Sequence, residues 1–266
     1  MAFQKGGFQR RNFLAEARRG VQEAYKGRDI LLSHTVKAIL ELNRAANLLY
    51  ETLTEWYAIH FPELKVNEPE KFAELVQKID KAGLKASDID MMVGEAKAKE
   101  LEEKAKSSIG VDLNSEDVME IKRLATQLNE LYKLRASFEK YQEKLARELA
   151  PNISIVAGPE LAAKLIARAG NLRRLAMMPA STIQVLGAEK ALFKHLRKHT
   201  KPPKHGLIFQ HVSISMSPKE QRGKIARALS TKIAIASKAD AFSKRMIADK
   251  LKADFDARLK MIKGEK

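Results

Sequence analysis

The 266-residue sequence contains no cysteine, which excludes disulfides, thiolate catalysis and cysteine-ligated zinc. It has no run of about 18 or more apolar residues, so a membrane-spanning helix is excluded. The first residues lack the apolar core and the cleavage site of a signal peptide. Aromatic residues make up only 6% of the chain, and glycine (13) and proline (8) are few. We therefore expect a cytoplasmic protein built from helices.

Acidic residues are scarce in the C-terminal part of the chain. Residues 151–266 carry 24 lysines and arginines against 8 aspartates and glutamates, residues 29–150 carry 18 against 23, and residues 1–28 carry 7 against 2. The formal net charge of +16 favours a polyanionic partner, most often a nucleic acid. The uneven distribution predicts a basic leader over 1–28, a mildly acidic domain over 29–150 and a basic module over 151–266.

The acidic domain begins with a predicted long helix over residues 29–61. Its apolar residues recur at alternating steps of three and four, which is the spacing of a coiled-coil seam. Pro62 ends the helix because proline has no backbone N–H to donate and clashes with the preceding turn. The predicted seam residues are Ile39, Leu42, Ala46, Leu49, Leu53 and Trp56.

A second long helix is predicted between Asn114, a favourable N-cap, and Pro151. Its seam shows the same alternation, so the two helices are expected to form an antiparallel coiled-coil hairpin whose tip, residues 62–114, contains short helices. An ordinary helical-bundle core is the alternative. Polar residues at two seam positions either set the register or mark where the hairpin opens to solvent. The seam residues are Ile121, Leu124, Leu128, Leu131, Arg135, Phe138, Gln142, Leu145 and Leu149.

The basic module contains a stretch, from Lys190 to His205, that has no acidic residue. On a helix, four of its cations fall at i, i+4, i+7 and i+8 and form one continuous face. Leu192 and Leu196 lie on a different face and are available for the core. A basic stripe with an apolar stripe behind it suits phosphate recognition, although a solvated basic face is the alternative. The four cations are Lys190, Lys194, Arg197 and Lys198.

Other functions of this stretch are less well supported by the residues. The pair Gly187-Ala188 lacks the rest of a phosphate-binding loop and more plausibly permits a close backbone approach to RNA or to a neighbouring helix. The spacing of His195, His199 and His205 matches no common metal site, so RNA contacts or plain surface positions are expected. The module shows no cofactor loop, no metal cluster and no carboxylate pair, so we expect no enzyme activity, cofactor or metal.

The basic module resembles a known family. The segments AAKLIARAGNLRRLAMMPASTIQVLGAEKALFKHLRK, TKPPKHGLIFQH and RGKIARALSTKIAIASKAD resemble the Nop domain, and are most similar to its archaeal form, found in scaffolds of box C/D guide-RNA ribonucleoproteins. Residues 28–64 also resemble the family's first coiled-coil helix. The resemblance implies an all-α fold in which a long antiparallel coiled-coil hairpin is followed by a compact, basic helical Nop domain over 151–266.

The resemblance also implies partners. Members of the family bind a kink-turn RNA together with the ribosomal-type kink-turn protein already on it, and their coiled coils pair two copies. An N-terminal domain holds fibrillarin, a methyltransferase that modifies RNA 2′-hydroxyls. Only 28 residues precede the coiled coil here, too few for a globular domain, so we expect that domain to be missing, which counts against direct fibrillarin binding. A splicing-particle relative and a coiled-coil protein with non-specific RNA affinity are the alternatives.

The family's functional positions can be carried onto this sequence in three groups. The first group is expected to contact RNA: Gly187, Ala188, Glu189, Lys190, Lys194, His195, Arg197, Lys198 and Lys204. The second is expected to face the kink-turn protein, with the core beneath that surface as the alternative: Arg168, Arg173 and Arg174. The third is expected to pair two copies through the coiled coil: Leu124, Leu128, Leu131 and Phe138.

Overall fold

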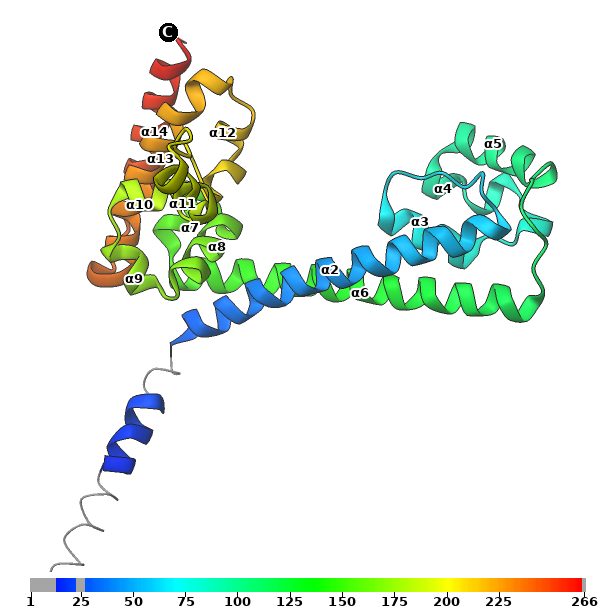
Figure 1. Cartoon of the computed structure of the whole chain (residues 1–266), viewed down its shortest axis with the longest axis horizontal. Coiled ribbons are helices and arrows are strands. Elements are labelled where there is room, and N and C mark those ends of the chain that lie inside the picture. Colours follow the sequence, from blue (N-terminus) through cyan, green and yellow to red (C-terminus); the bar gives the residue numbers. More distant parts are fainter. Residues whose placement is uncertain (1–12, 23–26, 265–266) are drawn as a thin grey trace, which may run out of the picture. The chain divides into compact units, whose positions relative to one another are not determined.

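A computed structural model describes residues 13–22 and 27–264. Within these ranges all regular structure is helical, without a strand (Figure 1), which confirms the all-α prediction. None of the described helices is both long and apolar enough to cross a membrane. The chain divides into two compact units: the hairpin unit, residues 38–138, and the basic unit, the described residues up to 37 and from 139 onward.

The hairpin unit is built on the two predicted long helices, α2 (Arg28–His60) and α6 (Ser115–Leu149), which run in opposite directions (Figure 1). Helix α2 ends two residues before Pro62, as predicted. Helix α6 begins after Asn114, whose Oδ1 accepts a hydrogen bond from the backbone N–H of Asp117 at 2.8 Å. The tip contains α3 (Pro69–Lys78), η1 (Lys81–Gly83), η2 (Ala86–Asp88), α4 (Asp90–Val93) and α5 (Glu95–Lys106).

The buried face of α2 departs from the predicted seam near the tip. Trp56 is 40% exposed, whereas its neighbour Tyr57 is 2% exposed. The ring of Tyr57 packs edge-on against Phe72 of α3, with ring centroids 6.1 Å apart, and Tyr50 does the same at 5.7 Å. Because α2 packs against α3 as well as α6 here, its buried face turns away from a two-helix seam, so the prediction for Trp56 is wrong.

The hairpin unit also corrects one residue of the predicted dimer surface. Leu128 is fully buried in a core shared with Leu53 and Phe72 of its own chain. It therefore stabilises the hairpin itself and cannot offer an exposed contact to a second copy. Leu124 packs against the same core, and Leu131 and Phe138 are half-buried.

The predicted polar seam position Arg135 lies where three elements meet. Its guanidinium donates to Asn43 of α2 at 3.3 Å and to the carboxylate of Glu70 on α3. It also lies over the ring of Tyr132, 5.3 Å from the centroid. Arg135 thus links α6 to both neighbouring helices, a geometry in keeping with a residue that sets register.

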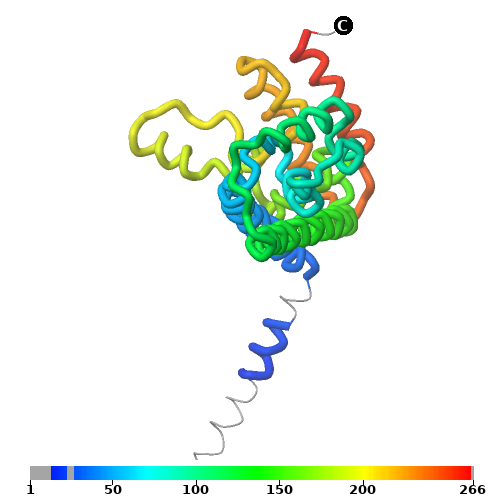
Figure 2. The backbone as a smooth tube through the Cα atoms, turned by 90° about the vertical axis from the view of Figure 1, so that its right-hand side faces the viewer, coloured from blue at the N-terminus to red at the C-terminus, as the bar shows by residue number. Residues whose placement is uncertain are grey.

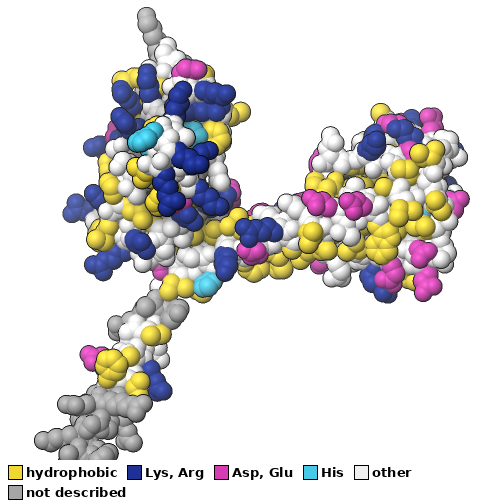
Figure 3. Space-filling view, viewed as in Figure 1, with side chains coloured by type: hydrophobic (Ala, Val, Ile, Leu, Met, Phe, Trp, Pro, Cys, Tyr) yellow, Lys and Arg dark blue, Asp and Glu magenta, His cyan; other side chains and the backbone are white. Residues whose placement is uncertain are grey.

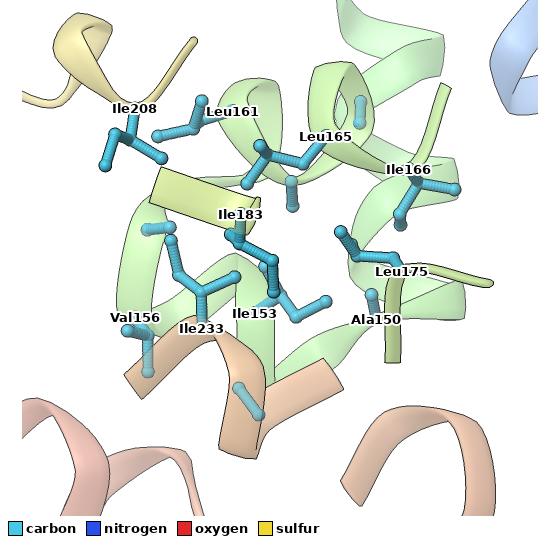
Figure 4. Packing of buried hydrophobic residues seen from close by; sticks show 14 of the residues in the cluster. Ala150, Ile153, Val156, Leu161, Leu165, Ile166, Leu175, Ile183, Ile208 and Ile233 are labelled. Atoms are coloured by element: carbon cyan, nitrogen blue, oxygen red, sulfur yellow. The ribbon is translucent and has the colours of Figure 1, made fainter. Parts of the chain in front are cut away.

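The basic unit packs its short helices around one apolar core, in which Ile153, Leu165, Ile183 and Ile233 point toward one another (Figure 4). Leu32 of α2 and Leu145 of α6 belong to the same core. The two units therefore divide inside the long helices, whereas the sequence suggested a boundary at residue 151. The elements are α7 (Pro151–Ala157), α8 (Pro159–Ala169), α9 (Leu172–Met177), α10 (Ala180–Val185), α11 (Glu189–Lys198), η3 (Leu207–Gln210), α12 (Val212–Ser215), α13 (Lys219–Lys238), the π-helical turn η4 (Ala239–Ser243) and α14 (Ala248–Lys263).

A buried carboxylate holds the first turn of α7 in place. Asp240 is 1% exposed, and its two oxygens accept the backbone N–H of Asn152 at 3.1 Å and of Ile153 at 3.0 Å. The side-chain amide of Asn152 donates to Asp240 at 2.6 Å and to the carbonyl oxygen of Arg245 at 2.9 Å. Burial raises the pKa of Asp240, while these hydrogen bonds act in the opposite direction. Asp240 thus caps a helix that has no side-chain cap of its own.

Candidate nucleic-acid interface

All the predicted RNA-binding residues lie on one projecting segment, residues 187–205, here called the α11 excursion. Figure 2 shows it standing clear of the other helices of the basic unit. Two backbone hydrogen bonds close its base, from Gly206 N to the carbonyl oxygen of Gln184 and from Leu207 N to that of Leu186, each 2.8 Å long. The side-chain amide of Gln184 donates to the carbonyl oxygen of Lys204 at 2.7 Å. Both ends of the excursion are therefore attached to α10.

Two glycines permit this closure. Gly187 has φ +90°, and a Cβ there would lie 2.6 Å from Cγ of Leu207. A Cβ on Gly206 would lie 2.1 Å from the carbonyl oxygen of Leu186, which is too close for any side chain. Of the two roles considered for Gly187-Ala188, the structure supports close approach to a neighbouring segment of the same chain.

Glu189, the first residue of α11, holds the turn that leads into the helix. Its carboxylate accepts two hydrogen bonds from the Arg168 guanidinium, at 3.0 Å and 2.6 Å, and one from the backbone N–H of Gly187 at 2.9 Å. The Arg168 hydrogen bond is the main reason that the pKa of Glu189 falls to about 2. Glu189 was predicted to contact RNA and Arg168 to contact a protein partner, but these two side chains bind each other.

The four cations of the predicted stripe, Lys190, Lys194, Arg197 and Lys198, are all exposed. Within the described part of the chain, no acidic side chain forms an ion pair with any of them. Figure 3 shows lysine and arginine side chains over much of the visible face of the basic unit. The excursion therefore presents positive charge that α11 itself does not neutralise, as a phosphate-binding helix requires.

The apolar side of α11 differs from the prediction. Leu192 is half-buried, but Leu196 is 62% exposed. Helix α11 has no buried residue, so the expectation that Leu196 joins the core is wrong. The helix lies away from the core because its two ends, rather than its apolar face, attach it to the unit.

The three histidines of the excursion have different surroundings. Nδ1 of His195 hydrogen-bonds to the carbonyl oxygen of Thr200, just after α11. His199 ends α11 in a left-handed conformation, with φ +49°. The ring of His205 is stacked on that of Phe209 in η3, with centroids 4.5 Å apart. Among the described residues, no three acidic or histidine side chains gather as metal ligands would.

Lys204 lies near the end of the excursion, and two of the arginines predicted to face the kink-turn protein lie on α9. The aliphatic stem of Lys204 lies against Gly223 of α13, 3.7 Å from the position that a Cβ would take there. Arg173 and Arg174 are exposed on α9, and the guanidinium of Arg173 lies 6.0 Å from the ring centroid of Phe242.

Comparison with known proteins identifies the family of the chain. The family model described as "Nop: snoRNA binding domain, fibrillarin" matches residues 38–261. The chain belongs to the Nop family. A NOP5 family protein of Methanocaldococcus jannaschii is 45% identical over 239 residues, covering 89% of this chain and 58% of that protein. Nucleolar protein 56 of Dictyostelium discoideum is 36% identical over 245 residues, covering 84% of this chain and 45% of that protein.

A solved structure agrees with the Nop-family fold. A chain in a crystal structure of a fibrillarin/Nop5p complex superposes with a TM-score of 0.57 at 26% identity, covering 98% of this chain and 80% of that chain. The chain spans about half the length of the curated Nop-family relatives named above, 58% of one and 45% of the other.

Sequence reasoning missed one feature of the candidate interface. Arg222 of α13 lies over the Phe209 ring, 5.3 Å from its centroid, next to the His205 stack. The four-residue spacing of His205 and Phe209 was the available signal, but η3 lies outside any long helix, so periodicity did not reveal the pairing.

Proposed function

We propose that this Nop-family chain is a non-catalytic scaffold of a box C/D guide-RNA ribonucleoprotein. In this proposal the α11 excursion binds a kink-turn RNA that already carries its kink-turn protein. A partner methyltransferase of the fibrillarin type then methylates RNA 2′-hydroxyls at a distance set by the scaffold. The observation that carries the proposal is the exposed face of Lys190, Lys194, Arg197 and Lys198, which no acidic side chain of the described residues neutralises.

The test of RNA binding is a gel-shift titration with a kink-turn RNA, with and without the kink-turn protein, at two salt concentrations. We expect tight binding only when the kink-turn protein is present. Equal binding without it would support non-specific RNA affinity instead. Purified chain should show no methyl transfer by itself, and detectable transfer would contradict the scaffold role.

A double variant, Lys190→Ala with Lys194→Ala, tests the face directly. Each lost phosphate contact makes the negative slope of log affinity against log salt shallower by about 0.9, so the double variant should make it shallower by about 2. The matched control is Lys250→Ala with Lys260→Ala, two exposed lysines of α14, which should leave the slope unchanged. If the salt slope of the α11 variant is unchanged, this face does not contact RNA phosphates and this part of the proposal is wrong.

We further propose that the hairpin unit pairs two copies through the outer face of α2. Leu48 is 65% exposed and Ile59 is 51% exposed, and their eleven-residue separation, about three helical turns, puts them on one face. Val111, 60% exposed, lies beside Ile59 because its N–H donates to the Ile59 carbonyl oxygen at 2.8 Å. Leu48→Glu with Ile59→Glu should yield monomers in size-exclusion chromatography with light scattering, whereas Val212→Glu in the basic unit should not. A dimer that survives the double change would refute this face.

A further inference from the structure

A stack of three side chains lies where the α11 excursion returns to the core. The rings of His205 and Phe209 are nearly parallel, with an interplanar angle of 14° and centroids 4.5 Å apart. The guanidinium of Arg222 lies over the same Phe209 ring at 5.3 Å. His205 belongs to the excursion, Phe209 to η3 and Arg222 to α13, so the stack joins one end of the excursion to two core elements.

The backbone holds Arg222 in position. Its Nε donates to the carbonyl oxygen of Ser217 at 2.8 Å, and Nη2 donates to that of Ser215 at 3.3 Å. These two hydrogen bonds hold the guanidinium against the segment just before α13, where it lies over the Phe209 ring. Burial and the charge of Arg222 both lower the pKa of His205, which favours the neutral form of the stacked imidazole.

The α11 excursion is held by side-chain contacts at both of its ends. The helix has no buried residue, so its own packing does not orient it. At the other end of the excursion, the turn is held by the Arg168–Glu189 pair. At the returning end, the Gln184 amide and the stack hold the residues next to Lys204.

We propose that His205, Phe209 and Arg222 form a clamp that positions the α11 excursion for RNA without contacting RNA themselves. The inference rests on the proposed function, because it concerns the same interface. Holding the cationic face in its bound orientation before RNA arrives lowers the ordering cost of binding. The three residues are therefore positioning residues rather than phosphate ligands.

The clamp makes a prediction that separates positioning from contact. His205→Ala should weaken binding of the kink-turn RNA–protein complex about three- to tenfold, the typical value of one aromatic pair. The salt slope should stay at the wild-type value, because no phosphate contact is lost. His205→Phe keeps an aromatic ring on Phe209 and should bind like wild type. Hydrogen exchange of the amides of 187–205 should accelerate in His205→Ala but not in His205→Phe.

Controls separate the possible failures. If wild type does not bind the complex, the proposed function fails before the clamp is tested. If wild type binds and His205→Phe loses affinity while its melting temperature is unchanged, the imidazole contacts RNA and the clamp is wrong. The clamp is also overturned if His205→Ala binds like wild type. The same holds if His205→Ala makes the slope of log affinity against log salt shallower, as the Lys190/Lys194 variant should. Leu229→Ala, in the core of α13, should lower the melting temperature without the faster exchange confined to 187–205.

Discussion

Replacing Asp240 by alanine should destabilise the basic unit by about 2–4 kcal/mol. The change leaves the backbone N–H groups of Asn152 and Ile153 buried without an acceptor, at a cost of about 1–3 kcal/mol each. The side-chain amide of Asn152 keeps its bond to the Arg245 carbonyl oxygen. Part of the loss is offset because the buried carboxylate, whose pKa burial raises, no longer has to be desolvated.

Urea unfolding followed by far-UV circular dichroism measures this loss at neutral pH. Asp240→Asn retains one acceptor oxygen and should lose about half as much stability, provided that hydrogen bonds contribute separately. The matched control is Asp256→Ala, an exposed aspartate within α14, which should change stability by less than about 0.5 kcal/mol. If Asp240→Ala loses no more stability than Asp256→Ala, the carboxylate does not cap α7 and the reasoning is refuted.

Three further predictions concern single positions. Because the pKa of Glu189 is lowered to about 2, the ionised carboxylate stabilises the fold fully above its ordinary pKa of 4.5, and this stabilisation is lost as the pH falls through 2. The melting temperature should therefore fall more between about pH 5 and about pH 2 in wild type than in Glu189→Gln. Gly206→Ala, whose Cβ would lie 2.1 Å from the Leu186 oxygen, should lower the free energy of unfolding in urea by about 2–4 kcal/mol. Gly223→Ala, whose Cβ would lie 3.7 Å from its nearest neighbour, should leave this free energy unchanged or raise it by up to about 1 kcal/mol. Asn114→Ala should cost about 1 kcal/mol of hairpin stability, and no change would argue against the N-cap.

Local signals in the sequence were sufficient to predict the two long helices and to recognise the family. Pro62 and Asn114 act on adjacent backbone, so the end of α2 and the start of α6 were predicted close to where they lie. The i, i+4, i+7, i+8 spacing from Lys190 placed four cations on one face of a helix, and all four are exposed on α11. Such features depend on residues within one or two helical turns, which a sequence displays directly.

Tertiary structure decided which faces are covered and which side chains meet. Tyr57 is buried in place of Trp56 because α3 packs against α2 near the tip. Leu196 remains exposed because the excursion is attached by its ends. The carboxylate of Glu189 pairs with the guanidinium of Arg168, which lies 21 residues earlier in the chain. The Asp240 cap joins residues 88 positions apart. Burial and hydrogen bonding between distant segments depend on how the helices pack, and helical periodicity specifies only the face that each helix can offer.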